Sequence, residues 1–279
     1  MSQLTVKDHS RVFSDFVYVY PVVSRRSRGV SLGINLNVNN ACNWRCVYCQ
    51  VEGLVRGKPE EIQLDKLEHE LDYMLNWIVN GDFVEKHAPI ELRRFNDVCL
   101  SGNGESTLSH QFLSTINIIS KLRDKYGLNE KIKTILITNG SEIDRPDIVD
   151  SLKLMSSLNG EVWFKIDSIT KSGINRVNQV VLTPESVKKR LILSASLCKT
   201  FIQTCMFRVN DLDPDSQDVD KYIKFVKEVR EGIAGVLLYS TARNPALPEG
   251  HDISSVSVEF LSNIAKELSK DGIEVKYYQ

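Results

Sequence analysis

The sequence predicts an α/β protein in which parallel strands lie inside and helices lie outside. Two observations lead to this fold class. Short β-rich segments alternate with longer amphipathic segments along the 279 residues, giving six consecutive strand-then-helix units. Such a repeat is typical of a parallel sheet covered by helices. In addition, charged residues on the inner face of one strand favour a curved, barrel-like sheet over an open one.

The strands are expected where β-branched and aromatic residues form short runs. These runs cover residues 31–38, 97–102, 131–138, 161–168, 200–209 and 235–240, and a terminal strand is expected over 273–278. Each strand is followed by a helix, expected over residues 62–80, 111–125, 146–156, from 183 onward, 218–231 and 255–269.

Apolar residues at helical spacing support the helices. The first three stripes are Leu64, Leu67, Leu71, Met74 and Ile78; Phe112, Ile116 and Ile119; and Ile148, Leu152 and Met155. The fourth helix has a start signal, with Thr183 as N-cap, Pro184 in the first turn and Glu185 at the positive end of the helix dipole.

The fourth strand helps to decide between an open sheet and a curved, barrel-like one. Trp163, Lys165 and Asp167 alternate along it and therefore share one face. Two charges on an inner face would be costly in a packed core. They are expected to line a solvated lumen that holds a ligand.

Composition excludes several classes of protein. The chain is 42% hydrophobic and 25% charged, as expected for a globular protein, and its net charge of −1 gives no global attraction to nucleic acid. The basic run at residues 24–28 is interpreted as a solvated loop rather than a phosphate site. Residues 1–10 have no apolar core of a signal peptide, and no apolar run has membrane-spanning length. Six cysteines are too few for a disulfide scaffold, so we expect a cytoplasmic protein.

The most informative motif is a cysteine loop that follows the first strand. Cys42, Cys46 and Cys49 offer three thiolates within eight residues, and no fourth Cys or His lies near them in sequence. Soft thiolate ligands suit iron–sulfur clusters or zinc. Structural zinc normally takes four protein ligands, and Cys99 is the residue that would have to supply the fourth through space.

Polar residues at the other strand ends complete a candidate site, because ligands collect at the carboxyl ends of parallel strands. The second strand ends in Gly102-Asn103-Gly104-Glu105, where the glycines permit a close approach of the backbone and Glu105 can accept a bond from an ammonium group. The later strands end in Asn139 and in Lys165 with Asp167.

The cysteine loop with Tyr48 before its last cysteine, the Gly-Asn-Gly-Glu segment, and Thr138-Asn139-Gly140 resemble motifs of the radical S-adenosylmethionine (radical SAM) superfamily. The resemblance extends over residues 18–245. The segments at residues 24–26, 31–35, 202–211 and 239–245 resemble those of a narrower group, the Fe–S oxidoreductases related to the wyosine-forming tRNA enzyme. It implies a partial (β/α)6 barrel, a [4Fe-4S] cluster on the three cysteines, and reductive cleavage of S-adenosylmethionine to a 5′-deoxyadenosyl radical that abstracts hydrogen from a substrate. A reductant such as flavodoxin or ferredoxin is implied as partner.

The resemblance also assigns roles. The cofactor contacts are expected from Tyr48, Gly102, Asn103, Gly104, Glu105, Asn139, Lys165, Asp167 and Gln203. The substrate side is expected to include Arg208, Tyr239 and Arg243, where the arginines grip a carboxylate or phosphate or instead pair with acids at the rim. One domain is expected, with an extension over 1–30, the barrel over about 31–245, and a helix and strand over 246–279.

The chain departs from the wyosine-forming enzyme in one respect. That enzyme carries a second cluster on upstream cysteines, whereas this chain has none before Cys42. Cys99, Cys198 and Cys205 are interpreted as small buried hydrophobic residues. The near-neutral net charge also disfavours a nucleic-acid substrate, because affinity for nucleic acid depends on neutralising phosphates. The sequence does not name the substrate. The alternatives are a non-catalytic iron–sulfur or zinc-binding protein and, last, an ordinary methyltransferase.

Overall fold

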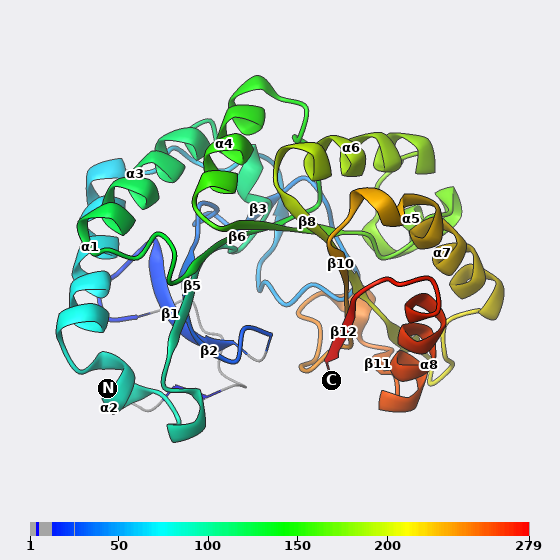
Figure 1. Ribbon diagram of the computed structural model, residues 1–279. Coiled ribbons are helices and arrows are strands. Elements are labelled where there is room, and N and C mark those ends of the chain that lie inside the picture. The colour runs from blue at the N-terminus through cyan, green and yellow to red at the C-terminus, as the bar shows by residue number, and fades with distance from the viewer. Residues whose placement is uncertain (1–3, 6–12, 25, 279) are drawn as a thin grey trace.

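An eight-stranded sheet curls into an arch, with its helices on the convex side (Figure 1). This computed structural model describes residues 4–5, 13–24 and 26–278. The strands lie in the order β1, β2, β5, β6, β7, β8, β10, β12. Their bounds are Val19–Ser24, Gly29–Ile34, Phe95–Leu100, Lys133–Thr138, Gly160–Lys165, Lys199–Cys205, Gly235–Tyr239 and Val275–Tyr278. All neighbouring strands are parallel except β1 and β2, which form an antiparallel hairpin.

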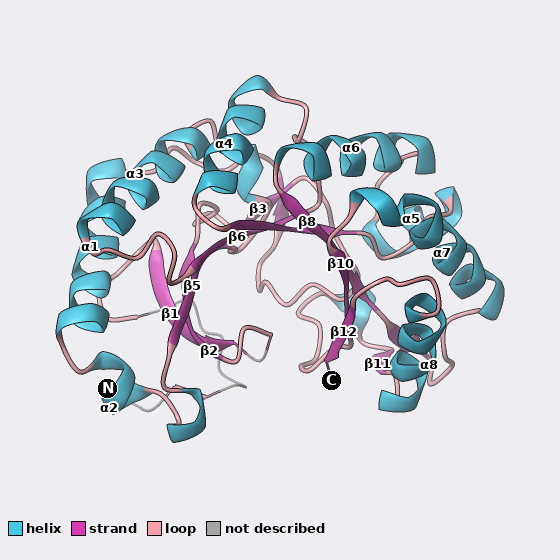
Figure 2. Cartoon of the chain, viewed as in Figure 1, coloured by secondary structure: helices cyan, strands magenta, loops and turns pink. Residues whose placement is uncertain are grey.

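Six long helices cover the outside of this arch (Figure 2). They are α1 (Leu64–Asn80), α3 (Phe112–Lys125), α4 (Pro146–Ser157), α6 (Pro184–Leu197), α7 (Ser216–Val229) and α8 (Val258–Ser269). The expected stripes are buried: Leu67, Phe112 and Ile148 are each fully shielded from solvent. The Thr183 hydroxyl caps α6 by accepting a bond from Ser186 N. The predicted strand–helix units and the partial barrel are confirmed.

The structure adds shorter elements. The helices α2 (Phe83–His87) and α5 (Lys171–Asn178) and the 3-10 turns Ile90–Leu92, Ser106–Leu108, Arg230–Gly232 and Pro248–Gly250 lie between the main elements. Two small sheets pair β3 (Ala41–Cys42) with β4 (Val55–Arg56) and β9 (Phe207–Val209) with β11 (Ile253–Ser255).

Three expected strands do not extend as far as predicted. The strand expected over residues 31–38 is β2, which ends at Ile34; the sheet also contains β1, before that strand, and β12, where the terminal strand is expected. The strand expected over 161–168 stops at Lys165. The strand expected over 200–209 is divided at Met206, because β9 leaves the main sheet to pair with β11.

The parallel order brings distant segments together at one end of the arch. Since β2 neighbours β5 and β5 neighbours β6, the loops after these strands lie side by side. The cysteine loop, the Gly-Asn-Gly-Glu segment and Asn139 therefore meet at the carboxyl ends of the strands. None of the described helices has the length and apolar character needed to cross a bilayer.

Candidate functional site

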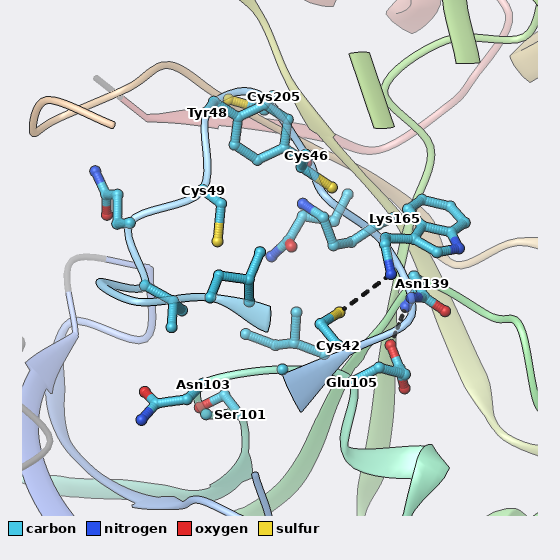
Figure 3. Close-up of a pocket in the computed structure, with 18 of the residues that line it drawn as sticks. Cys42, Cys46, Tyr48, Cys49, Ser101, Asn103, Glu105, Asn139, Lys165 and Cys205 are labelled. Carbon is cyan, nitrogen blue, oxygen red and sulfur yellow. Dashed lines mark hydrogen bonds between the residues drawn. The ribbon is translucent and has the colours of Figure 1, made fainter. Parts of the chain in front are cut away.

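A cavity of about 290 Å³ lies at the carboxyl ends of the strands and receives all three cysteines of the loop (Figure 3). Its wall also includes Tyr48, Gly102, Asn103, Gly104, Glu105, Asn139, Lys165, Gln203, Tyr239 and Arg243. Within the described residues, no three Cys, His, Asp or Glu side chains stand close enough to hold a single metal ion. Most of the predicted site residues thus share one cavity, and two, Asp167 and Arg208, do not line it.

Asparagines fix the position of the chain that leads into the cysteine loop. The Asn35 Oδ1 atom accepts bonds from Asn37 N and Asn103 N, each at 3.0 Å. The Asn37 amide in turn donates to the carbonyl oxygens of Ala41, at 2.9 Å, and Glu105, at 3.2 Å. The end of β5 is therefore bound to the segment immediately before Cys42.

The two glycines of this segment are needed for packing between backbones. A Cβ on Gly104 would lie 2.1 Å from the Ala41 carbonyl oxygen, and one on Gly102 would lie 2.3 Å from Asn35 Oδ1. Neither glycine has a positive φ. Their absent side chains let the β5 loop press directly against the chain that carries the cysteines.

The Glu105 carboxylate is buried and engaged by the protein itself. Its Oε1 accepts bonds from Thr107 N, Thr107 Oγ1 and Thr138 Oγ1 at 2.6–3.1 Å, and its Oε2 accepts from Asn139 N at 2.6 Å. Burial raises the pKa of Glu105 despite these donors. Glu105 ties β5 to β6, and its Oε2 has one lone pair left for a ligand in the cavity.

Asn139 connects the third strand end to the cysteine loop. Its Nδ2 donates to Asn43 Oδ1 at 2.9 Å, and Asn43 donates to Ser141 Oγ at 2.7 Å. The Thr-Asn-Gly sequence thus holds the residue that follows Cys42.

Lys165 is a largely buried cation in the cavity wall. Its Nζ donates to the Tyr239 hydroxyl at 3.0 Å and lies 4.9 Å from the centre of the Tyr48 ring. Burial alone would lower the pKa of Lys165, but the charge of Asp167, 3.9 Å away, raises it above its ordinary value. Lys165 is therefore a cation that can pair with a carboxylate.

Asp167 lies behind the wall, beneath the cysteine loop. Its Oδ2 accepts bonds from the Tyr48 hydroxyl at 2.5 Å and from Asn178 Nδ2 at 2.9 Å, while Oδ1 accepts from Cys205 N at 3.0 Å. Its side chain is fully buried. The sequence predicts Asp167 as a cofactor contact. In the structure Asp167 does not line the cavity and instead accepts the hydrogen bond that anchors Tyr48.

Amide groups point at two of the thiols. Trp44 N lies 3.5 Å from Cys42 Sγ, and Asn178 Nδ2 donates to Cys46 Sγ at 3.2 Å. Burial raises the pKa of Cys42 to about 11 and that of Cys46, also facing the charge of Asp167, to about 12. Loading a metal here must therefore displace protons, because the thiolate is the ligand.

The donor set and the wall fit a thiolate-bound cluster with a small polar ligand beside it. Three soft sulfurs enter one cavity, as iron–sulfur ligation requires. The Gln203 side chain, 1% exposed, lines the same cavity, and its Nε2 has no partner among the described residues. A buried amide group without a partner is costly, so a bound ligand that accepts its hydrogen would satisfy it.

A cover segment, residues 241–250, lies across the cysteine loop. Arg243 donates to Gln50 Oε1 at 2.6 Å, Ala246 N donates to the Cys49 carbonyl at 2.8 Å, and Arg45 Nε pairs with Glu249 at 2.8 Å. Arg208, by contrast, pairs with Asp213 at 2.9 Å near the surface. Arg208 thus follows the alternative of an arginine paired with an acid at the rim.

The remaining cysteines are buried, as expected. Cys205 lies on the cavity wall beside Tyr48, Cys99 faces the lumen with Trp163, and Cys198 caps the end of α6.

Sequence reasoning missed Asn35, Asn37, Asn43 and Asn178. Residues 35–43 contain five asparagines, and that density beside a cysteine loop is a signal that was available. No comparable signal marks Asn178, because it reaches Cys46 only through the packing of α5 against the loop.

Comparison of the sequence with known proteins found distant relatives. No known family model matches the chain. It is 25% identical over 167 residues to UPF0026 protein slr1464 of Synechocystis sp., covering 60% of this chain and 54% of that protein. It is 23% identical over 217 residues to GTPase Obg of Brachyspira hyodysenteriae, covering 75% of this chain and 28% of that protein. The chain thus spans about half the length of the first relative and about a quarter of the second. It also lacks the P-loop motif of nucleotide hydrolases.

Solved structures decide the fold. SuiB of Streptococcus suis, bound to its precursor peptide SuiA, superposes with a TM-score of 0.61 at 13% identity, over 90% of this chain and 48% of that chain. TYW1 with a lysine–pyruvate adduct bound superposes with a TM-score of 0.57 at 16% identity, over 88% of this chain and 74% of that chain. The chain has the radical SAM fold. In this chain the cysteine loop follows β2, and the cavity lies at the carboxyl ends of the strands.

Proposed function

We propose that this protein is a radical SAM enzyme that uses a [4Fe-4S] cluster on Cys42, Cys46 and Cys49. The observation that carries the proposal is the shared cavity: three thiols of one loop and polar residues near the carboxyl ends of five strands (β5, β6, β7, β8 and β10) face the same space. The radical SAM fold adds support, since SuiB has also been solved with S-adenosylmethionine bound.

When bound, the cluster supplies the electron that splits S-adenosylmethionine into methionine and a 5′-deoxyadenosyl radical, which takes hydrogen from the substrate. The protein's residues bind and orient. The Lys165 ammonium pairs with the carboxylate of S-adenosylmethionine, and Glu105 Oε2 accepts a hydrogen from its ammonium group. Gln203 Nε2 donates to an acceptor of the same ligand.

Asn139 and the backbone of Gly102–Gly104 shape the wall against which the ligand lies. Tyr48, fixed by Asp167, closes the wall between Cys46 and Cys49. The cover segment excludes water from the loop, because Arg243, Ala246 and Glu249 bind it at three points.

Anaerobic reconstitution with iron and sulfide tests the proposal. The protein should become brown and hold about four irons per chain. Replacing Cys42, Cys46 or Cys49 by alanine should remove the colour, whereas the matched control Cys198→Ala, far from the cavity, should keep it. A colourless protein that takes up one zinc ion would contradict the proposal.

A further inference from the structure

The lumen of the arch continues below the cysteine cavity into a second cavity. This lower cavity, of about 880 Å³, is lined by residues near the amino ends of the inner strands, by the whole of β12 and by the β1–β2 hairpin. Its size lies within the range of small-molecule sites, about 300–1,000 Å³. It lies at the opposite end of the strands from the cysteine loop.

Positive charge dominates the lower cavity. Six cations, Arg26, Arg28, Arg94, Lys131, Lys133 and Lys276, line it against two acids, Asp97 and Glu161. Aromatic rings of Trp163, Phe201, Tyr277 and Tyr278 stand between them. The lower cavity therefore suits an anionic organic molecule.

The two acids already have partners. Glu161 pairs with Lys133 Nζ at 2.7 Å and Lys199 Nζ at 3.4 Å, and it accepts a bond from Trp163 Nε1. Asp97 accepts a bond from the Ser31 hydroxyl. Neither carboxylate forms an ion pair with Arg26.

Arg26 lies where the two cavities meet and lines both. Its guanidinium carbon stands 4.5 Å from the centre of the Tyr239 ring and 5.7 Å from that of Trp163. Within the described residues its guanidinium has no hydrogen-bond or ion-pair partner. The hairpin tip that carries it bends into the hollow of the arch (Figure 1).

This position corrects an expectation. The basic run at 24–28 was expected to be a solvated loop, which holds for the exposed Arg28, whereas Arg26 turns inward; Arg25 lies outside the described residues. A guanidinium stacked on aromatic faces keeps its donors in a fixed plane, ready for bidentate binding of an oxyanion.

We propose that Arg26 binds the carboxylate or phosphate of a small organic substrate that enters the lumen through its amino-terminal mouth. The other end of this substrate then points past Tyr239 toward the cysteine cavity. The inference rests on the proposed function only in naming the ligand a substrate; the anion site itself requires no cluster.

The three tryptophans make the site measurable. Trp163 lies beneath Arg26, Trp44 lines the cysteine cavity, and Trp77 lies on the outer helix α1. Their indole N–H signals in a nitrogen–proton NMR spectrum therefore report on the lower lumen, the cofactor cavity and the outside, respectively. Sodium phosphate and sodium acetate are titrated at constant ionic strength, and S-adenosylmethionine is titrated separately.

Phosphate or acetate should shift the Trp163 signal until it saturates and should leave the Trp77 signal unchanged. The anion that saturates at the lower concentration shows whether the site prefers a phosphate or a carboxylate group. Arg26→Gln should raise that concentration about tenfold or more. Arg26→Lys, which keeps the charge but loses the planar fork, should give an intermediate value. Arg230→Gln, the same charge change at an exposed site, should behave as the wild type.

Three results would overturn the inference: no saturable shift at Trp163 in the wild type, an unchanged titration in Arg26→Gln, or loss of the S-adenosylmethionine shift at Trp44 in that variant. The last would place Arg26 in the cofactor site. If the protein binds the anion through Arg26 but assembles no cluster, the proposed function is contradicted and the anion site is still supported.

Discussion

The hydroxyl of Tyr48 donates a 2.5 Å hydrogen bond to Asp167, a residue 119 positions away. This bond joins the cysteine loop to the end of β7 and holds the aromatic ring between two of the cysteines. Through this bond, contacts within the protein itself hold the loop in place around the cavity.

Tyr48→Phe should lower the free energy of unfolding by about 1–2 kcal/mol, because a buried hydrogen bond to a carboxylate is lost while the ring packing remains. Denaturant unfolding of the cluster-free protein measures this. Tyr73→Phe, at a half-exposed site on α1, is the control and should change stability little. Equal losses in both variants would mean that the bond to Asp167 does not hold the loop.

Gly104→Ala should displace the cysteine loop, because the new Cβ would lie 2.1 Å from a backbone oxygen. We expect a loss of about 1–3 kcal/mol in stability and reduced iron uptake on reconstitution. Gly232→Ala meets nothing within 4 Å and should have neither effect. Full iron uptake by Gly104→Ala would show that the close approach of the two loops is dispensable.

Much of this arrangement could be predicted from sequence. Leu67, Phe112 and Ile148 were predictable core positions because helical spacing alone places them on one face. The meeting of Cys42 with Glu105 followed from parallel order, because consecutive strand ends share one edge of the sheet.

Other parts depended on tertiary contacts. β1 has strand composition but contains Pro21, which is tolerated because β1 lies at the edge of the sheet. Asn178 and Arg26 come from a short helix and a hairpin tip, and only packing turns their side chains toward Cys46 and Tyr239. Asp167 was placed by alternation on the lumen face, but β7 ends at Lys165, so alternation no longer applies.

Asn178→Leu should make the reduction potential of the reconstituted cluster more negative. Its amide donates to Cys46 Sγ, and hydrogen bonds to ligand sulfurs stabilise the more negative, reduced state. A potentiometric titration followed by electron paramagnetic resonance measures the change. Asn175→Leu, on the exposed face of the same helix, should leave the potential unchanged. A potential unaffected by Asn178→Leu would mean that the amide does not reach the bound form of Cys46.

Asp97→Asn should stabilise the protein increasingly as pH rises. Burial raises the pKa of Asp97 to about 6, above an unfolded value of about 3.9; Lys133 opposes this rise and Glu161 adds to it. A carboxyl whose folded pKa is raised contributes its full stability below about pH 4 and loses it as pH rises to about 6. Above pH 6 the free energy of unfolding of the wild type should therefore be lower than that of the variant by up to about 2–3 kcal/mol.

Thermal unfolding of both proteins between pH 4 and pH 8 checks this. Asp220→Asn, at an exposed position, should show no such trend. A constant difference between Asp97→Asn and the wild type across this range would mean that Asp97 does not titrate inside the folded lumen.

The central claim is that three thiols hold a cluster able to cleave S-adenosylmethionine. Its most direct test is the amount of 5′-deoxyadenosine formed when the reconstituted protein receives dithionite and S-adenosylmethionine without oxygen. We predict that the wild type and Cys198→Ala release the nucleoside and that variants lacking Cys42, Cys46 or Cys49 release none. A brown, iron-loaded wild type that forms no 5′-deoxyadenosine would contradict the account.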